Sequence, residues 1–134
     1  MLQAARQMSD ERDVDVLTQV HQQALRASIQ EAAAALFRVL SGRIAAYVVG
    51  VRDTKTVHRW ANGAVTGIRP ESESRLRAAY EIITLLLRFE TPATVRAWFI
   101  GLAPELDDVS PARTIHEGRL EEAIGAARAF AANG

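Results

Sequence analysis

Residues 40–63 read LSGRIAAYVVGVRDTKTVHRWANG, a pattern that predicts two short helices joined by a tight turn. In the first helix the apolar residues recur at helical spacing and share one face; they are Ile44, Tyr47, Val48 and Val51. Gly50 provides the backbone freedom that a sharp turn requires. Because Asp53 or Thr54 can cap free N–H groups and Asn62-Gly63 is a typical stop, the second helix is predicted between them.

The second predicted helix has an apolar face and a polar face. Val57 and Trp60 share the apolar face and are expected to pack inward. The opposite face carries the side chains that can reach base edges and phosphates: Thr54, Lys55, His58, Arg59 and Asn62. This arrangement is typical of a helix-turn-helix whose second helix lies in the DNA major groove. The alternative is that both are ordinary core helices with a solvated basic face.

Charge is distributed unevenly along a chain whose net charge is zero. Residues 43–77 carry seven basic and three acidic side chains, whereas residues 78–134 carry five basic and eight acidic ones. The basic excess therefore coincides with the predicted helix-turn-helix, where phosphates would have to be neutralised. DNA would repel the acidic C-terminal half, which is better suited to another partner.

Composition predicts a helical protein of 134 residues, either one domain or a small domain with an appended helical half. Only four prolines and 49% apolar residues favour helix over strand. The absence of Cys excludes disulfides and thiolate chemistry. We expect no apolar run near 18 residues, hence no signal peptide or membrane span, and a cytoplasmic protein.

Residues 1–27 are predicted to be an N-terminal extension, frayed over 1–13 and helical over 14–25. The apolar positions of that helix are Val14, Leu17, Val20, Ala24 and Leu25, with His21 at their flank. The helix either pairs with its copy in a dimer or docks on the rest of the chain.

Further helix boundaries can be read from capping patterns. Ser28 and Glu31 form a capping box, which predicts a helix that ends at Gly42 and packs Phe37 against Trp60. Three further helices are predicted to start at a proline in the first helical position, two of them directly after a cap residue. These starts are Pro70, Thr91-Pro92 and Ser110-Pro111. The predicted helices run over 70–90, 92–100, 112–117 and 119–132. Trp98, Phe99 and Leu102 are expected to point inward with Val95.

Two parts of the chain resemble one family. Gly50-Val51 followed by Val57, Trp60 and Gly63 resembles the Xre-type helix-turn-helix, which commonly closes on Val-x-x-Trp-x-x-Gly. The spacing from Gly50 to Val57 is one residue longer than usual there. Residues 96–118 contain, in order, a Trp helix, a Pro-x-Leu loop, a Ser-Pro helix start and a Gly before the last helix. This order resembles the toxin-binding domain of the Xre/MbcA/ParS antitoxins.

The resemblance covers residues 28–134 and implies an all-α protein with two parts. Residues 28–69 would form the Xre-like helix-turn-helix, and residues 70–134 a small helical toxin-binding domain. The family's partner is typically a RES-domain toxin that degrades NAD, with the antitoxin's last helix and tail against the toxin. The toxin-binding residues implied here are Arg119, Arg128, Asn133 and Gly134. The implied function is an antitoxin that neutralises its toxin and, as a homodimer on a palindromic operator, represses its own operon.

Two other functions remain as alternatives. The chain could be a stand-alone transcriptional regulator whose second half serves dimerisation or another protein. It could also be an interaction protein that has lost DNA binding. An enzyme is not expected, because His21, His58 and His116 are far apart and no HExxH, Ser-His-Asp or glycine-rich phosphate motif is present. We therefore expect no catalytic residue, no metal site, no cofactor and no membrane partner.

Overall fold

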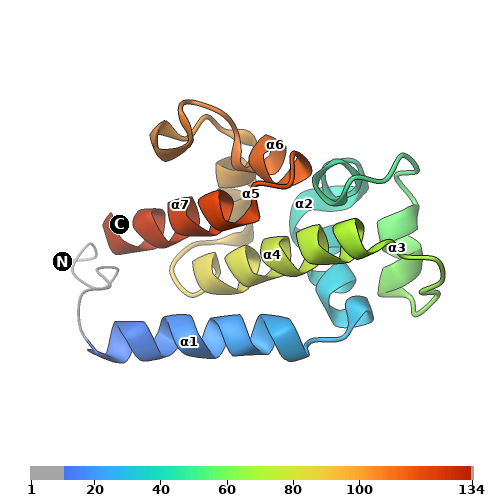
Figure 1. Cartoon of the computed structure of the whole chain (residues 1–134), viewed down its shortest axis with the longest axis horizontal. Helices are drawn as coiled ribbons and strands as arrows, with labels where there is room; N and C mark the ends of the chain where they lie inside the picture. Colours follow the sequence, from blue (N-terminus) through green and yellow to red (C-terminus); the bar gives the residue numbers. More distant parts are fainter. Residues whose placement is uncertain (1–10, 134) are drawn as a thin grey trace.

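The computed structural model describes residues 11–133 and is all-α, as predicted (Figure 1). Residues 1–10 of the predicted N-terminal extension lie outside the described residues. Within 11–133 the elements are α1 (Glu11–Arg26), α2 (Ile29–Val49), α3 (Thr56–Ala61), α4 (Pro70–Leu86), α5 (Pro92–Ile100), the 3-10 helix η2 (Pro104–Leu106), α6 (Pro111–His116) and α7 (Leu120–Asn133).

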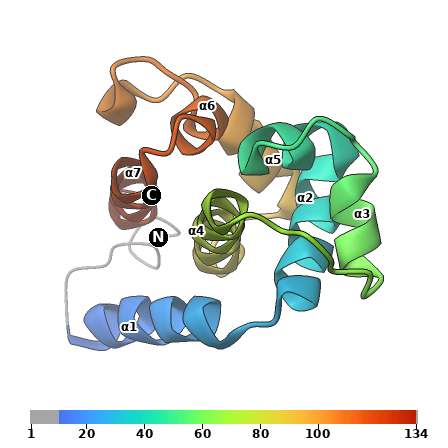
Figure 2. The ribbon, with the colours of Figure 1, turned by 45° about the vertical axis from the view of Figure 1, so that its right-hand side comes forward.

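Helix α4 lies in the middle of the bundle and contacts α1, α2, α6 and α7 (Figure 2). Its apolar residues are buried on several sides, among them Leu76, Ile82, Ile83 and Leu86. The helix ends at Leu86 and not near Glu90 as expected. The chain leaves the helix there through short turns, so that Leu87 is partly exposed instead of buried.

One hydrophobic core extends across the predicted boundary between residues 69 and 70. It contains Leu36 and Val48 from α2, Ile82 from α4, Phe99 from α5 and Ile115 from α6. Burial of these side chains is the main stabilising term for such a fold. The predicted helix-turn-helix segment and the C-terminal half are therefore packed against each other.

Helix α1 docks on α4 in this structure. Val20 and Ala24 are buried, whereas Val14 and Leu25, which were expected on the same face, are exposed. The helix is held by polar contacts as well. The guanidinium of Arg77 donates from Nη1 to the carbonyl oxygens of Ala24 (3.0 Å) and Ala27 (2.7 Å), at the C-terminal end of α1.

Helix α2 begins as predicted and breaks one residue earlier than predicted. Ser28 and Glu31 form both hydrogen bonds of the capping box, at 3.0 and 2.9 Å. The expected end at Gly42 is wrong, because the non-helical residue is Ser41, with φ 71° and ψ 168°. A new helical segment follows at once and continues to Val49.

Replacing Ser41 with glycine should raise the free energy of unfolding. A Cβ is unfavourable in this backbone conformation by about 1–3 kcal/mol, and glycine's greater freedom in the unfolded chain offsets roughly 0.5–1 kcal/mol of the gain. We expect a net stabilisation of about 1 kcal/mol, measured by urea unfolding followed by circular dichroism.

The matched control is Ser74→Gly, the same substitution at an exposed helical position of α4. It should destabilise, by about 0.5 kcal/mol, because glycine is the poorer helix former. Equal destabilisation by both variants would contradict the assignment of strain to Ser41.

Helix α2 also corrects the expectation that no apolar run approaches 18 residues. By length and composition alone it is apolar enough to cross a membrane. However, 56% of its most apolar 18-residue window is buried inside the bundle, and the helix is broken at Ser41. This pattern is that of the core helix of a helical bundle.

The predicted caps of the C-terminal helices are confirmed. The Oγ1 atom of Thr91 accepts from the N–H of Thr94 at 3.3 Å, and the Oγ atom of Ser110 accepts from the N–H of Arg113 at 3.1 Å. The expectation for Leu102 was wrong, since this side chain is 74% exposed. Helix α5 ends at Ile100, so Leu102 no longer follows the helical spacing that places Val95 and Phe99 inside.

Candidate nucleic-acid interface

The turn between α2 and α3 is built on Gly50. This residue has φ 81°, in the left-handed region, and its N–H donates to the carbonyl oxygens of Ala46 (3.0 Å) and Tyr47 (3.2 Å). The N–H of Val51 also donates to Ala46, at 3.0 Å. The carbonyls of Ala46 and Tyr47 are thereby satisfied, and the chain reverses in a way that glycine permits at low cost.

A close backbone approach places the chain that enters α3. A Cβ at Gly42 would lie 2.9 Å from the carbonyl oxygen of Thr54. Residue 42 must therefore be glycine for reasons of space, since the segment before α3 rests directly on the break in α2. The kink at Ser41 and the position of α3 are linked by this contact.

Helix α3 is shorter than predicted and starts later. It runs from Thr56 to Ala61, and its N-cap residue, Lys55, makes no side-chain capping bond. Asp53, a predicted cap, lies in the turn that precedes the helix. There its Oδ1 accepts a hydrogen bond from the N–H of Lys55 at 2.8 Å. This bond, followed by the hydrogen bond from Arg59, holds the pKa of Asp53 below its ordinary value of 3.8. The carboxylate is therefore ionised at neutral pH.

The two faces of α3 are arranged as the sequence predicted. Val57 and Trp60 are buried, Trp60 to 4% exposure. The five predicted DNA-contacting residues are all exposed to solvent; they are Thr54, Lys55, His58, Arg59 and Asn62. Anchoring by one face leaves the other free to meet a ligand.

Two of these exposed side chains have intramolecular partners that the sequence did not predict. The ring of His58 stacks on Phe37, with centroids 4.6 Å apart, so the expected packing of Phe37 on Trp60 is wrong. Phe37 is partly exposed at the surface, and its ring meets the exposed His58 and not the buried Trp60. The guanidinium of Arg59 donates to the Oδ2 atom of Asp53 (3.3 Å) and to Thr56 (3.0 Å).

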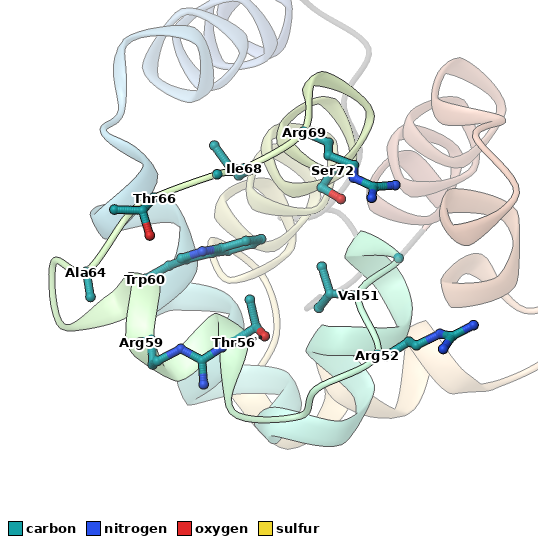
Figure 3. Close-up of a pocket in the computed structure, with 12 residues that line it drawn as sticks. Val51, Arg52, Thr56, Arg59, Trp60, Ala64, Thr66, Ile68, Arg69 and Ser72 are labelled. Carbon is teal, nitrogen blue, oxygen red and sulfur yellow. Dashed lines mark hydrogen bonds between the residues drawn. The ribbon is translucent and has the colours of Figure 1, made fainter.

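Basic residues near α3 extend the candidate surface beyond the predicted set. Arg52 and Arg69 are exposed and line a hollow between the turn, α3 and the start of α4 (Figure 3). Sequence reasoning did not single them out, although both belong to the basic segment 43–77. The excess of basic residues in this segment could have pointed to them. It could not, however, show which of its arginines lie close together in the fold.

The residues implied in toxin binding are spread along α7. Arg119 precedes this helix and Asn133 ends it, roughly 20 Å away along the axis. Asn133 is exposed, and Gly134 lies outside the described residues. Arg128 donates from Nη2 to the Oε2 atom of the buried Glu81 at 3.4 Å. Glu81 also contacts the Nδ1 atom of His21 at 2.9 Å, which joins α1, α4 and α7.

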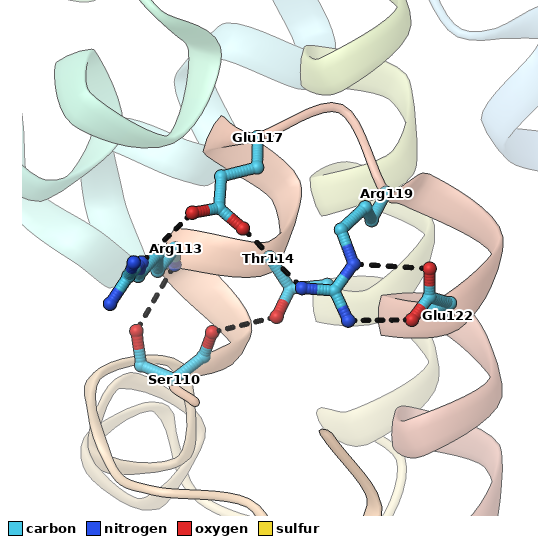
Figure 4. Close-up of polar contacts among 6 residues, drawn as sticks. All are labelled: Ser110, Arg113, Thr114, Glu117, Arg119 and Glu122. Atoms are coloured by element: carbon cyan, nitrogen blue, oxygen red, sulfur yellow. Dashed lines mark hydrogen bonds and ion pairs between the residues drawn. The ribbon is translucent and has the colours of Figure 1, made fainter. Parts of the chain in front are cut away.

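Arg119 is held between two carboxylates (Figure 4). It donates to both oxygens of Glu122, at 2.7 and 3.1 Å, and to Glu117 at 3.4 Å. The bond to Glu122, more than that to Glu117, raises the pKa of Arg119, and the same bond lowers the pKa of Glu122. A partner's carboxylate would have to displace these bonds to reach the guanidinium.

Comparisons with protein-family models, with characterised proteins and with solved structures found no match for this chain. Within residues 11–133 no group of three or more metal-ligating side chains comes together. The exposed face of α3 and the arginines around it carry the positive charge and hydrogen-bond donors that an anionic ligand requires.

Proposed function

We propose that this chain is a DNA-binding repressor whose C-terminal half binds a protein partner. The DNA-binding part of this proposal rests on one observation, which is that α3 has one buried face and one exposed polar face. Val57 and Trp60 anchor it in the core, while Lys55, His58 and Arg59 are presented to solvent. A short helix held rigidly from one side, with donors on the other, meets the requirements for entering a major groove.

The proposed partner is a RES-domain toxin that degrades NAD, following the resemblance of residues 96–118 to antitoxins. Apolar surface supports a protein partner for this half. Ile100, the last residue of α5, and Leu102, two residues further along the chain, are both more than half exposed. Exposed apolar side chains that cluster are common in protein interfaces. The proposal implies a cytoplasmic antitoxin that acts on its operator as a homodimer.

Arg59→Ala tests the DNA-binding face. If Arg59 reads a guanine, operator binding should weaken by about 1–3 kcal/mol. The measurement is fluorescence anisotropy at fixed salt with labelled duplex from the region upstream of the chain's own gene. Wild-type affinity should also fall steeply with added salt. Unchanged affinity of the variant would remove Arg59 from the interface.

Asp53→Asn is the matched control for this substitution. Both variants break the pair between Asp53 and Arg59, which is exposed and contributes little to stability. The asparagine retains an oxygen for the N–H of Lys55, and Arg59 keeps its charge. We therefore expect DNA affinity to stay the same or to rise by about two- to fivefold at low salt. A loss equal to that of Arg59→Ala would mean that the pair itself, and not the guanidinium, matters.

The partner is tested by purifying the N-terminally tagged chain from its native host at moderate salt and identifying co-eluting proteins by mass spectrometry. A stoichiometric NAD-degrading enzyme would support the antitoxin function. Recovery of the chain alone, with specific DNA, would instead support a stand-alone regulator. Absence of salt-dependent affinity for any duplex would contradict the DNA-binding proposal.

A further inference from the structure

A cavity of about 390 Å³ lies between the turn after α2, helix α3 and the first residues of α4 (Figure 3). Its walls combine basic, hydroxyl-bearing and apolar groups, with Trp60 forming part of the apolar wall. The size is within the range of small-ligand sites, whereas the lining is more polar than is usual for them. The cavity is separate from the side chains of Lys55, His58 and Asn62, which do not line it.

Ser72 is the unexplained group in this cavity. The residue is 5% exposed and lines the cavity. In Figure 3 its hydroxyl oxygen points from α4 toward the side on which Val51 lies. No hydrogen bond to this hydroxyl is formed anywhere in residues 11–133, although the hydroxyls of other helix residues, such as Thr114, find one. This hydroxyl opens onto the cavity, so its donor and acceptor sites are available to a molecule bound there.

The start of α4 adds further donors. Arg69 is the N-cap residue and makes no side-chain capping bond, and Pro70 follows at the first position. The first N–H of this helix to find a backbone acceptor is that of Glu73, which donates to the carbonyl oxygen of Arg69 at 2.9 Å. The N–H groups of Glu71 and Ser72 are therefore available at the positive end of a 17-residue helix.

Two guanidinium groups flank these donors. Arg52 and Arg69 line the cavity, and neither has an ion-pair partner in the described part of the chain. Arg59, which also lines it, is already paired with Asp53. Of the two acidic residues in the first turn of α4, Glu73 is paired with Arg77 at 3.1 Å, and neither Glu71 nor Glu73 lines the cavity. The cavity therefore presents net positive charge.

We propose that this cavity binds a phosphate group. The hydroxyl and the N–H group of Ser72 donate to the phosphate oxygens, and Arg52 and Arg69 neutralise their charge. The phosphate belongs either to a small phosphate ester that fills the cavity against Trp60 or to the backbone of bound DNA. The second source rests on the DNA-binding function proposed above, whereas the first does not.

The test is a titration of the ¹⁵N-labelled full chain with inorganic phosphate and with AMP at constant ionic strength, followed by NMR. We expect saturable shifts of the N–H signals of Arg69 and Ser72, which line the cavity. Ser72→Ala and Arg69→Gln should each weaken the affinity by at least about fivefold, since each removes a hydrogen bond to a charged group. Arg88→Gln, the same charge change beyond the other end of α4, should change it by less than about twofold.

A duplex of random sequence, titrated in parallel without phosphate, separates the two sources. Loss of duplex affinity in Ser72→Ala and Arg69→Gln, but not in Arg88→Gln, identifies the DNA backbone as the source. Unchanged duplex affinity together with weakened AMP binding identifies a free phosphate ester.

The two proposals fail in different ways. Binding of phosphate by a chain that binds no duplex would support the cavity site and overturn the DNA-binding function. Absence of shifts at Arg69 and Ser72, with wild-type duplex affinity in both variants, would overturn the cavity site alone. Equal weakening by Arg88→Gln would also overturn it, because general charge would then explain the binding.

Discussion

Replacing Trp60 with alanine is expected to lower the free energy of unfolding by about 3–5 kcal/mol, the usual cost of truncating a buried large aromatic side chain. Trp60 is 4% exposed and belongs to the main core. Helix α3 has only six residues, too few to be stable by itself, so it depends on Trp60 and Val57 for its position. Urea unfolding followed by circular dichroism measures the loss, and duplex affinity should fall with it.

Trp98→Ala is the control for this prediction. Trp98 is partly buried in α5, where its ring contacts Phe99 and Phe130 at centroid distances of 5.4 and 6.1 Å. The same truncation there should destabilise less and leave the affinity for DNA unchanged at temperatures where the variant is folded. If Trp98→Ala reduced DNA affinity as much as Trp60→Ala, the specific role of Trp60 in holding α3 would be contradicted.

Replacing Arg77 with methionine should lower the free energy of unfolding by about 2–3 kcal/mol, because a charged donor to several part-buried carbonyls is lost. The carbonyl oxygens of Ala24 and Ala27 would lose their partner at the end of α1, and Glu73 would lose its ion pair. Methionine keeps most of the apolar stem. Hydrogen exchange should show the amides of α1 exchanging faster than those of α4.

Arg26→Met provides the comparison, since Arg26 is an exposed arginine in the last turn of the same helix. Its replacement should change stability by less than about 0.5 kcal/mol. Persistent protection of α1 in Arg77→Met would show that burial of Val20 and Ala24 is sufficient to hold the helix.

The features that could be predicted from sequence are those that depend on a few neighbouring residues. The capping box at Ser28, the caps at Thr91 and Ser110, and the inward positions of Val57 and Trp60 are local patterns of this kind. Local patterns also indicated which residues of α3 would be exposed, because burial of one face determines the other.

Two of the predictions that were wrong depended on contacts between distant residues. Gly42 was interpreted as a helix stop, yet its small size is required by the carbonyl of Thr54, and the break itself falls on Ser41. Phe37 stacks on His58 because the angle between α2 and α3, which no local pattern gives, brings these rings together.

The candidate site was predictable only in part for the same reason. The exposed face of α3 lies within nine residues of sequence, and the charge of segment 43–77 pointed to it. The cavity instead combines Arg52 with Arg69 and Ser72, which meet only because α4 folds back against the turn. Its unpartnered hydroxyl cannot be recognised without the surrounding structure.

The contact between Tyr47 and His116 joins the turn below α3 to the C-terminal half. The two rings stack with centroids 4.1 Å apart, and the Nδ1 atom of His116 lies 2.6 Å from the carbonyl oxygen of Tyr47, the carbonyl that also accepts from Gly50. Arg75 reinforces this junction by donating to the carbonyl oxygen of Ile115 at 3.2 Å while lying beside Gly50.

A partner that shifts α6 would therefore also shift the turn that orients α3. Thermodynamic linkage then requires reciprocity: the factor by which the partner changes the affinity for DNA is the factor by which DNA changes the affinity for the partner. In the proposed repressor, the amount of free partner would then change how much of the operator is occupied.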